Sequence, residues 1–543
     1  MADFLSIIKI EFLGLFGINK ALKANDSKQK RKLVTFMVFS LLATAMLIFL
    51  AVLMCVAFGD VYWEMGGEKS LRNLPSLMYT MTVILILVMG LHNVRGVLFG
   101  FKDYQLLMSM PIKNSAIISA KLCFMYIVDL AATMTLLIPS YILYGWFMDA
   151  GVVFYLVNSL LLFVLPLIPL ALALVVGTII TFLTARMRGQ NILEIVLSLA
   201  FICLLFAMNT LSNKEIANVG AVAAQNPIAW VYIKASCDLN LYAILGIIGV
   251  SIVVVAILFL VLERFYKPLN SALMSKHGKS DYVYKEQKSG TVFGALFKRE
   301  VRRYFSLPIY VLNTLSGGII GLIMPFMMFS NGIKLQTDGQ TILQALDSMS
   351  LATGSFKTIA ILFVAMPILV ASISATMPTT TPSISLEGKT FWILKSAPIG
   401  TKSVITSKLL LDYMIFLPFV ALSEIVLGVA IKLPYYAVIS FVLIGLFMVL
   451  FSGALGLYIN ICQPVFDWEN QSKPIKQSIA AVYTLLINGA ATLLLIGTCF
   501  AVYTYVGYLV AMIVVAVVAL ILAVISIILL YTRGIKKYNL ISD

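Results

Sequence analysis

The chain has 543 residues, of which 61 % are hydrophobic and 12 % charged, and its mean hydropathy is +1.01. A soluble globular domain carries about 25 % charged residues, so this composition excludes a soluble enzyme as the first interpretation. The formal net charge of +15 would suit a nucleic-acid binder, but the basic residues lie in short segments between apolar runs, and we expect no nucleic-acid partner. The six cysteines stand singly with no CxxC pair, so no disulfide or metal framework follows.

Apolar runs long enough to cross a bilayer follow one another along the chain. A transmembrane helix needs about 20 apolar residues, and the last uncharged run, 477–532, is too long for one helix and must turn near Tyr503–Gly507. The predicted spans are Leu33–Gly59, Asn73–Val94, Leu122–Met148, Ala150–Ala185, Ile195–Asn213, Leu239–Leu262, Tyr304–Ile333, Thr358–Leu386, Tyr413–Ile431, Leu433–Phe466 and the two parts of Gln477–Thr532. The sequence therefore predicts an all-α integral membrane protein with twelve transmembrane helices.

The basic residues indicate the orientation of these spans. Short loops rich in Lys and Arg stay in the cytoplasm, and when both termini are placed inside, the inner segments hold 32 of the 39 basic residues. We therefore expect both termini to be cytoplasmic. Most of these side chains are expected to contact anionic lipid headgroups, so membrane lipid is a predicted partner.

An internal repeat divides the chain. Residues 102–122 align without a gap with residues 389–409, 287 positions later, and Lys9–Glu11 is echoed by Lys298–Glu300. Because six spans per half is an even number, we expect two halves of the same orientation, related by an axis along the membrane normal. The predicted parts are a cytoplasmic amphipathic segment (1–32), a first six-span half (33–262), a cytoplasmic linker with a second amphipathic segment (263–303), a second six-span half (304–532) and a cytoplasmic tail (533–543).

Each copy of this element, 102–122 (the first repeated element) and 389–409 (the second), follows the second span of its half on the inner side. In each, a Pro-Ile pair ends a short helix, and a new amphipathic turn leads through a lysine into the next span. Two such elements would suit the docking of a two-fold cytosolic motor, and a plain loop lying on the headgroups is the alternative. The residues predicted to dock it are Lys102, Asp103, Ser109, Pro111, Ile112, Lys121, Lys389, Ser396, Pro398, Ile399 and Lys408.

These elements resemble those of a known family. Together with the basic stretch 4–23, the segment Phe297–Asn313 and Trp468–Asn470, they resemble the ABC-2 type permeases of bacteria, and more narrowly the fused twelve-span ABC exporter membrane subunits. The resemblance implies a bacterial plasma-membrane permease that forms the translocation path, with an elbow helix before each half and coupling helices at about Asp103–Ser119 and Thr390–Thr406. It also implies separate ATP-binding cassette subunits, expected in two copies, which would bind ATP and Mg²⁺.

The chain itself has no recognisable nucleotide-binding motif. A Walker A loop needs a first glycine where Ser383 stands, and a strand before it, whereas an apolar run precedes Ser383–Thr390. We therefore expect a transport subunit that is not an enzyme, with no catalytic residue, metal or cofactor of its own. The sequence does not name the exported substrate, for which lipid-like, amphipathic or peptide cargo is expected.

Ionisable groups inside spans usually mark a pathway or an ion pair, because their insertion costs about 2.5–3.5 kcal/mol. Asp129 in the third span and Glu424 in the ninth, with Asn313 in the seventh, are the pathway candidates. For the two acids, a carboxylate satisfied by neighbouring hydroxyls or by a lysine is an equal alternative. Asp129 and Glu424 are not at equivalent positions of the repeat, since Asp129 corresponds to Phe416.

Two other functions compete with the exporter. An ion-coupled secondary transporter of six-plus-six design should show a Gly-x-x-x-Asp-Arg-like loop after the second span, but residues 101–105 read Phe-Lys-Asp-Tyr-Gln. A lipid-modifying membrane enzyme should show a catalytic cluster at one interface, and Asp60, Glu64 and Glu68 at helical spacing are typical of a solvated acidic face instead. The secondary transporter stays the alternative.

Overall fold

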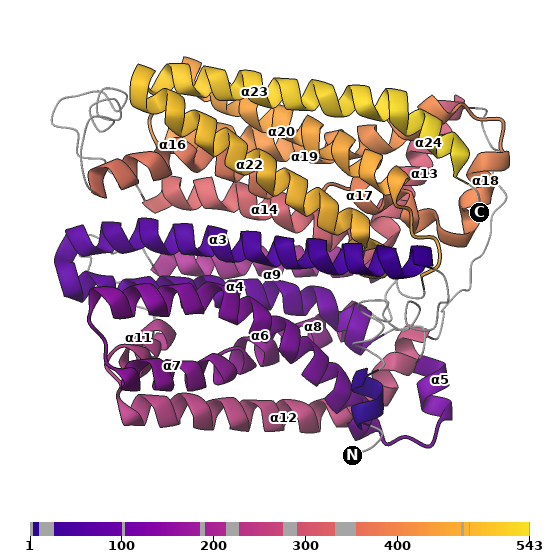
Figure 1. The fold of residues 1–543 in the computed structure, drawn as a ribbon. Helices are drawn as coiled ribbons and strands as arrows, with labels where there is room; N and C mark the ends of the chain where they lie inside the picture. The colour runs from indigo at the N-terminus through magenta and orange to yellow at the C-terminus, as the bar shows by residue number, and fades with distance from the viewer. Residues whose placement is uncertain are drawn as a thin grey trace. The chain divides into compact units, whose positions relative to one another are not determined.

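The structure is a computed structural model (Figure 1), and it describes residues 4–9, 27–99, 104–184, 190–212, 227–274, 290–331, 355–468, 472–476 and 478–541. Of these residues 90 % are helical and none forms a β-strand. In the described ranges, nine helices are long and apolar enough to cross a membrane, and a tenth is added if the bent pair Val292–Ser306 and Pro308–Ile323 is one span. The predicted all-helical architecture is therefore confirmed for the described residues. Their candidate spans indicate a multipass membrane protein, and the number twelve stays a prediction.

The chain falls into two compact units, Met1–His277 (unit 1) and Gly278–Asp543 (unit 2). The division lies inside the predicted linker 263–303. Each unit has its own buried apolar clusters, and each is described by itself.

Unit 1 is a bundle of helices whose breaks coincide with glycine and proline. Gly67, near the end of α3, adopts a left-handed conformation with φ of 58°, and the second candidate span begins at this residue. The predicted span Ala150–Ala185 is two helices, since Pro166 lies at the break. The helices are α3 (Ser27–Leu71), α4 (Asn73–Asn93), α5 (Tyr104–Ser109), α6 (Asn114–Phe147), α7 (Val152–Val164), α8 (Leu167–Thr184), α9 (Gln190–Ser212), α11 (Pro227–Ser236) and α12 (Leu241–Met274), with a π-helical turn η1 at Val94–Leu98.

Unit 2 packs around α20, which is largely buried against α16, α19 and α23. Gly507 has φ of 109° and ends α22 where the sequence predicted a turn. The helices are α13 (Val292–Ser306), α14 (Pro308–Asn331), α16 (Ser355–Ser374), α17 (Thr380–Ser383), the 3₁₀ turn η2 (Ser385–Thr390), α18 (Phe391–Ser396), α19 (Thr401–Ala430), α20 (Tyr435–Cys462), α21 (Ser472–Lys476), α22 (Ile479–Val506), α23 (Tyr508–Leu529), a π-helical turn η3 (Leu530–Gly534) and α24 (Ile535–Leu540).

Two predicted spans of unit 2 differ from the structure. The chain bends by 91° between α13 and α14, so the helix begins at Pro308, a residue suited to a first helical position, and not at Tyr304. The predicted span Thr358–Leu386 is wrong in its second part, because α16 ends at Ser374. Residues 375–390, here called the broken segment, contain only the short helices α17 and η2, since Pro378 and Pro382 interrupt the α-helical hydrogen bonds.

The two repeated elements have the same local structure. The bounds of α18, 391–396, are those of α5 plus 287, and α19 begins 287 residues after α6. The turn after each short helix has the same hydrogen bond, from Ile112 N to Met110 O and from Ile399 N to Ala397 O, both 2.7 Å long. Even a contact to the following span recurs: Tyr126 Oη donates to Phe163 O, and Tyr413 Oη to Leu450 O.

Gly90 of α4 tests the packing of unit 1. A Cβ added at Gly90 would lie 2.4 Å from Cβ of Ala173 in α8, whereas one at the exposed Gly249 of α12 would meet nothing within 4 Å. We expect Gly90→Ala to destabilise the protein by about 1–3 kcal/mol, as overpacking does. Gly249→Ala should be neutral or stabilising, by up to about 1 kcal/mol, because alanine favours the helix. Thermal unfolding midpoints in detergent measure both, and equal midpoints would contradict this packing.

Candidate coupling site

The short helix α18 is anchored on one face and exposed on the other. Phe391 and Leu394 are buried, and the Phe391 ring stacks on Phe466 with centroids 4.7 Å apart. Trp392 and Ile393 point away from this core, with 54 % and 50 % of their surface exposed. The helix therefore presents an apolar face outward while remaining fixed to unit 2.

The C-terminal helix α24 braces the second repeated element. Lys395 Nζ donates to the carbonyl of Asn539 (3.1 Å), and Thr401 Oγ1 donates to Oδ1 of the same residue (2.7 Å). Tyr538 adds an edge-to-face contact with Phe391. Figure 1 shows α24, α18 and α13 at the same end of unit 2.

A group of charged side chains lies beneath this element. Lys408, in the second turn of α19, has no exposed side-chain surface. Its ammonium donates to Glu300 Oε1 (3.0 Å), Glu387 Oε1 (2.9 Å) and Ser383 O (3.2 Å), which uses all three of its protons. The buried ion cluster, as we call it, consists of Arg299, Glu300, Arg303, Glu387 and Lys408.

Two of the three arginines of α13, Arg299 and Arg303, complete the electrostatics. Arg303 pairs with Glu387 and donates to Ser383 O (2.8 Å), while the partly exposed Arg299 also pairs with Glu387. Burial alone would raise the pKa of Glu387, but the three cations Lys408, Arg303 and Arg299 outweigh it and lower the pKa to about 2. Glu387 is therefore ionised at neutral pH.

The end of the broken segment is held by α20 and the chain after it. Asn460 Oδ1 accepts from the backbone N–H of Ile384 (2.8 Å) and Ser385 (3.1 Å), and its Nδ2 donates to Ser385 Oγ (2.7 Å). Trp468 Nε1 donates to Ser385 O (2.8 Å), and the Trp468 ring covers Gly388, whose φ is 54°. A side chain at this close, left-handed position would be strained.

This arrangement can transmit a displacement, because it joins three elements by short ionic contacts. Glu300 belongs to α13, Glu387 to the broken segment and Lys408 to α19. Since the contacts are buried and directional, moving any one of them alone would leave a desolvated charge without its partner. The carboxylates are occupied by cations, so the cluster offers no free acid or base for catalysis.

The structure places the predicted docking residues in three ways. Lys102 and Asp103 lie outside the described residues. Ser109, Pro111, Lys389, Ser396 and Pro398 are exposed, and Ile112 and Ile399 pack partly against the apolar clusters. Lys121 and Lys408 are buried, and Lys408 is enclosed by its carboxylate partners; the docking role of both stays a prediction.

The predicted pathway residues lie inside the units. Asp129 of α6 and Glu424 of α19 are buried, and Asn313 of α14 is half-buried. Lys121 and Asp129 lie eight residues apart on α6, and Lys408 and Glu424 lie sixteen residues apart on α19, so at 3.6 residues per turn neither pair is aligned along its helix. Asp412, one turn after Lys408, is also buried, and the sequence reasoning missed it because the ninth span was taken to begin at Tyr413.

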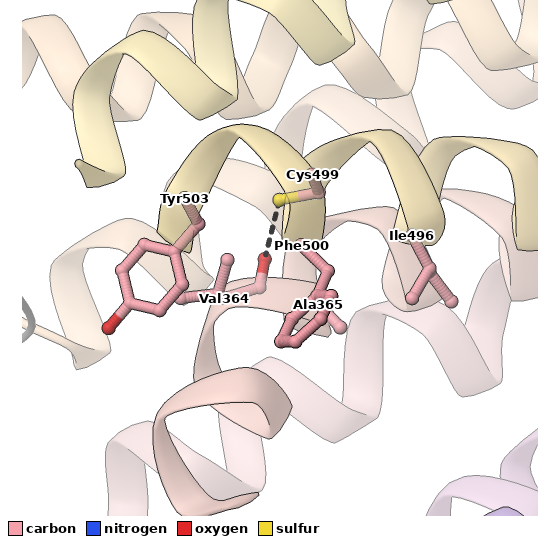
Figure 2. Close-up of a pocket in the computed structure, with 6 residues that line it drawn as sticks. All are labelled: Val364, Ala365, Ile496, Cys499, Phe500 and Tyr503. Carbon is pink, nitrogen blue, oxygen red and sulfur yellow. Dashed lines mark hydrogen bonds between the residues drawn. The ribbon is translucent and has the colours of Figure 1, made fainter. Parts of the chain in front are cut away.

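One described cavity lies between α16 and α22, lined by Val364, Ala365, Ile496, Cys499, Phe500 and Tyr503 (Figure 2). The Cys499 thiol donates to the carbonyl of Val364. The volume of the cavity is about 10 Å³, the space of one water molecule. This cavity is a packing gap and is too small for a cargo.

Comparisons with known proteins do not identify the chain. No family model matches the sequence, and no curated protein matches it significantly. Within the ranges that the structure describes, no group of three or more His, Cys, Asp or Glu is placed to hold a metal ion. The functional interpretation therefore depends on the geometry above.

Lys408 tests the buried ion cluster. Replacing it by methionine removes the charge that Glu300 and Glu387 share and leaves both carboxylates desolvated, so we expect Lys408→Met to cost about 3–5 kcal/mol. Lys402→Met is the matched control, because Lys402 lies in the first turn of the same helix and is exposed. Unfolding in detergent measures both, and similar midpoints for the two variants would refute the enclosed position of Lys408.

The pKa of Glu387 makes the cluster pH-dependent. A carboxylate whose pKa is lowered from 4.5 to about 2 on folding stabilises the fold above pH 4.5 and loses that contribution as the pH falls toward 2. Wild type should therefore be more stable than Glu387→Gln at pH 7, with the difference shrinking between pH 4.5 and about pH 3. Thermal midpoints of the two proteins across this range measure it, and a constant difference would contradict the ionised pair.

Proposed function

We propose that the protein is the membrane subunit of an ABC-2-like exporter, which forms the translocation path and docks separate ATP-binding cassette subunits. One observation carries the proposal: two helix–turn–helix elements 287 residues apart have the same helix bounds and the same turn hydrogen bonds. Two equivalent elements match the two-fold arrangement of a pair of cassette subunits. ATP and Mg²⁺ belong to those partners in this proposal.

The exposed face of α18 has the chemistry of a docking surface. Trp392 and Ile393 offer exposed apolar area beside Lys389 and Lys395. Tryptophan anchors surrounded by charged side chains are typical of interface hot spots. A cassette subunit with an apolar groove and an acidic rim would fit this face.

The buried ion cluster supplies the mechanical link. Closure of two cassette subunits on ATP binding would press on the repeated elements. In unit 2 the displacement would pass from α18 through Glu387 and Lys408 to α19, and through Glu300 to α13. Because the ionic contacts keep these three elements together, the spans would move as a group and not slide past α18.

The setting of this activity follows from the topology prediction. We propose a bacterial plasma membrane with both termini in the cytoplasm, so that the repeated elements face the ATP supply. The long lipid-facing helices of each unit suit a lateral gate, and hence lipid-like, amphipathic or peptide cargo. The direction of transport is assigned by the resemblance to exporters.

Trp392 and Ile393 test the docking surface. We expect the double change Trp392→Ser with Ile393→Ser to reduce co-purification of a cassette ATPase by at least about tenfold, because it removes the apolar anchor of the contact. Quantitative mass spectrometry after affinity purification in mild detergent, with an ATPase assay on the eluate, measures this. Replacing the Pro111 and Pro398 turns by Gly-Ser should abolish both signals.

The matched control is Tyr435→Ser with Tyr436→Ser. These side chains are also exposed, but they lie at the start of α20, after the opposite end of α19. This variant should keep its partner and its ATPase activity. Recovery of the folded wild-type chain alone, monodisperse and without ATPase activity, would contradict the exporter and favour the ion-coupled transporter.

A further inference from the structure

Asp412 is a buried carboxylate held against the broken segment. It lies one turn after Lys408 on the buried face of α19 and has no exposed surface. Its Oδ1 accepts two hydrogen bonds from Thr379, from the backbone N–H (2.6 Å) and from Oγ1 (2.7 Å). Its Oδ2 has no hydrogen-bond partner among the described residues.

Three further buried oxygen atoms near the same break also have no partner in the described ranges: Ser374 Oγ, Thr381 Oγ1 and Asn488 Oδ1. Ser374 is the last residue of α16, and Asn488 donates through Nδ2 to the next carbonyl, of Ala375 (3.3 Å), and to Ser452 Oγ (2.8 Å). All four atoms accept hydrogen bonds, and the carboxylate and amide oxygens can only accept. All four are oxygen atoms that could bind a cation.

Two glycines of α20 bring the helix close to these atoms. A Cβ on Gly453 would lie 2.4 Å from Asp412 Oδ2, and one on Gly456 would lie 2.6 Å from Thr381 Oγ1. Gly453 and Gly456 are three positions apart and are therefore neighbours on the surface of α20. The Asp412 carboxylate and the Thr381 hydroxyl thus contact adjacent points of one turn of this helix. The Gly453 carbonyl is also turned to this region, since Thr380 Oγ1 donates to it (2.7 Å).

No cationic side chain of the described residues faces Asp412. Among the described residues Asp412 forms no ion pair, and the ammonium of Lys408 is fully used by Glu300, Glu387 and Ser383. The C-terminus of α16 adds the negative end of a helix dipole. A buried carboxylate is protonated, paired with a counter-charge or bound to a metal ion.

We propose that Asp412, together with the hydroxyl and amide oxygens around the break between α16 and α17, binds a monovalent metal cation, Na⁺. The donors are all oxygen, with one carboxylate among neutral groups. Zn²⁺ prefers nitrogen and sulfur ligands, and Ca²⁺ sites draw on several carboxylates. Unwound backbone at a helix break, with helix C-termini, is the setting in which membrane helices coordinate Na⁺.

The site has a structural consequence that is independent of the exporter. Lys408 and Asp412 bind the broken segment at two points, Ser383 to Glu387 and Thr379. A bound Na⁺ would balance the charge of Asp412 and fix the N-terminal part of the broken segment. Ionic contacts would then hold the segment at both ends. This requires no cassette partner, so loss of one proposal leaves the other intact.

The experiment measures the thermal unfolding midpoint of the purified full chain in detergent against NaCl, with N-methyl-D-glucamine chloride keeping the ionic strength and pH constant. Binding to the folded state alone raises the midpoint with ligand concentration. We expect a saturable rise with Na⁺, and about one ²²Na⁺ bound per chain. Asp412→Asn should weaken the apparent Na⁺ affinity at least about tenfold.

Two further variants keep the test decisive. Thr381→Val keeps the shape of a candidate ligand but removes its oxygen, and it should also weaken the Na⁺ response if Asp412→Asn does not fold. Asp149→Asn is the matched control, because Asp149 is an exposed turn residue of unit 1 with φ of 46°, which asparagine tolerates. An unfolding midpoint that does not change with Na⁺, a midpoint that changes with pH alone, or full retention of the Na⁺ response in Asp412→Asn would each overturn the proposal.

Discussion

The end of unit 2 that carries α18 depends on one enclosed ammonium group. Lys408 contacts a carboxylate from α13, a carboxylate from the broken segment and a backbone carbonyl, all within 3.2 Å. Such buried ion pairs contribute little net stability compared with apolar side chains of the same size, but removing one partner is costly. The cluster therefore fixes which elements lie together and in which register, more than it holds the unit folded.

The broken segment is possible only because its polar groups find partners inside the unit. Irregular backbone at membrane depth is tolerated where protein buries it, and here Asn460, Trp468 and Asp412 bind its backbone directly. A continuous helix would have satisfied the same groups with fewer specific side chains. The sequence instead places two prolines and a run of hydroxyl residues there, and the result is a junction whose backbone is held by side chains of other helices.

The two repeated elements share a local fold but differ in the charges behind them. Both have a buried lysine in the second turn of the following helix. In unit 2 the next position on that face is Asp412, whereas in unit 1 the equivalent residue is Met125 and the acid, Asp129, lies one turn further along. Glu387 has Gly100 at its equivalent position. The two halves therefore differ in sequence at the positions of Glu387 and Asp412.

The sequence by itself determined the local features of this protein. Length and hydropathy predicted the helical, multipass character, and Gly507 lies in the segment where the last turn was predicted. The Pro-Ile pairs predicted a short helix in each repeated element, which the structure shows as α5 and α18. Each of these features follows from residues close together in the chain. Only the tertiary structure decided what surrounds Lys408. Glu300, Glu387 and Asp412 are separated in sequence by up to 112 positions, and no periodicity links α13 to a break between α16 and α18. The end of α16 could not be predicted for the same reason. The residues that follow it are uncharged and apolar enough to continue a span, and the hydrogen bonds that stabilise the break come from distant helices.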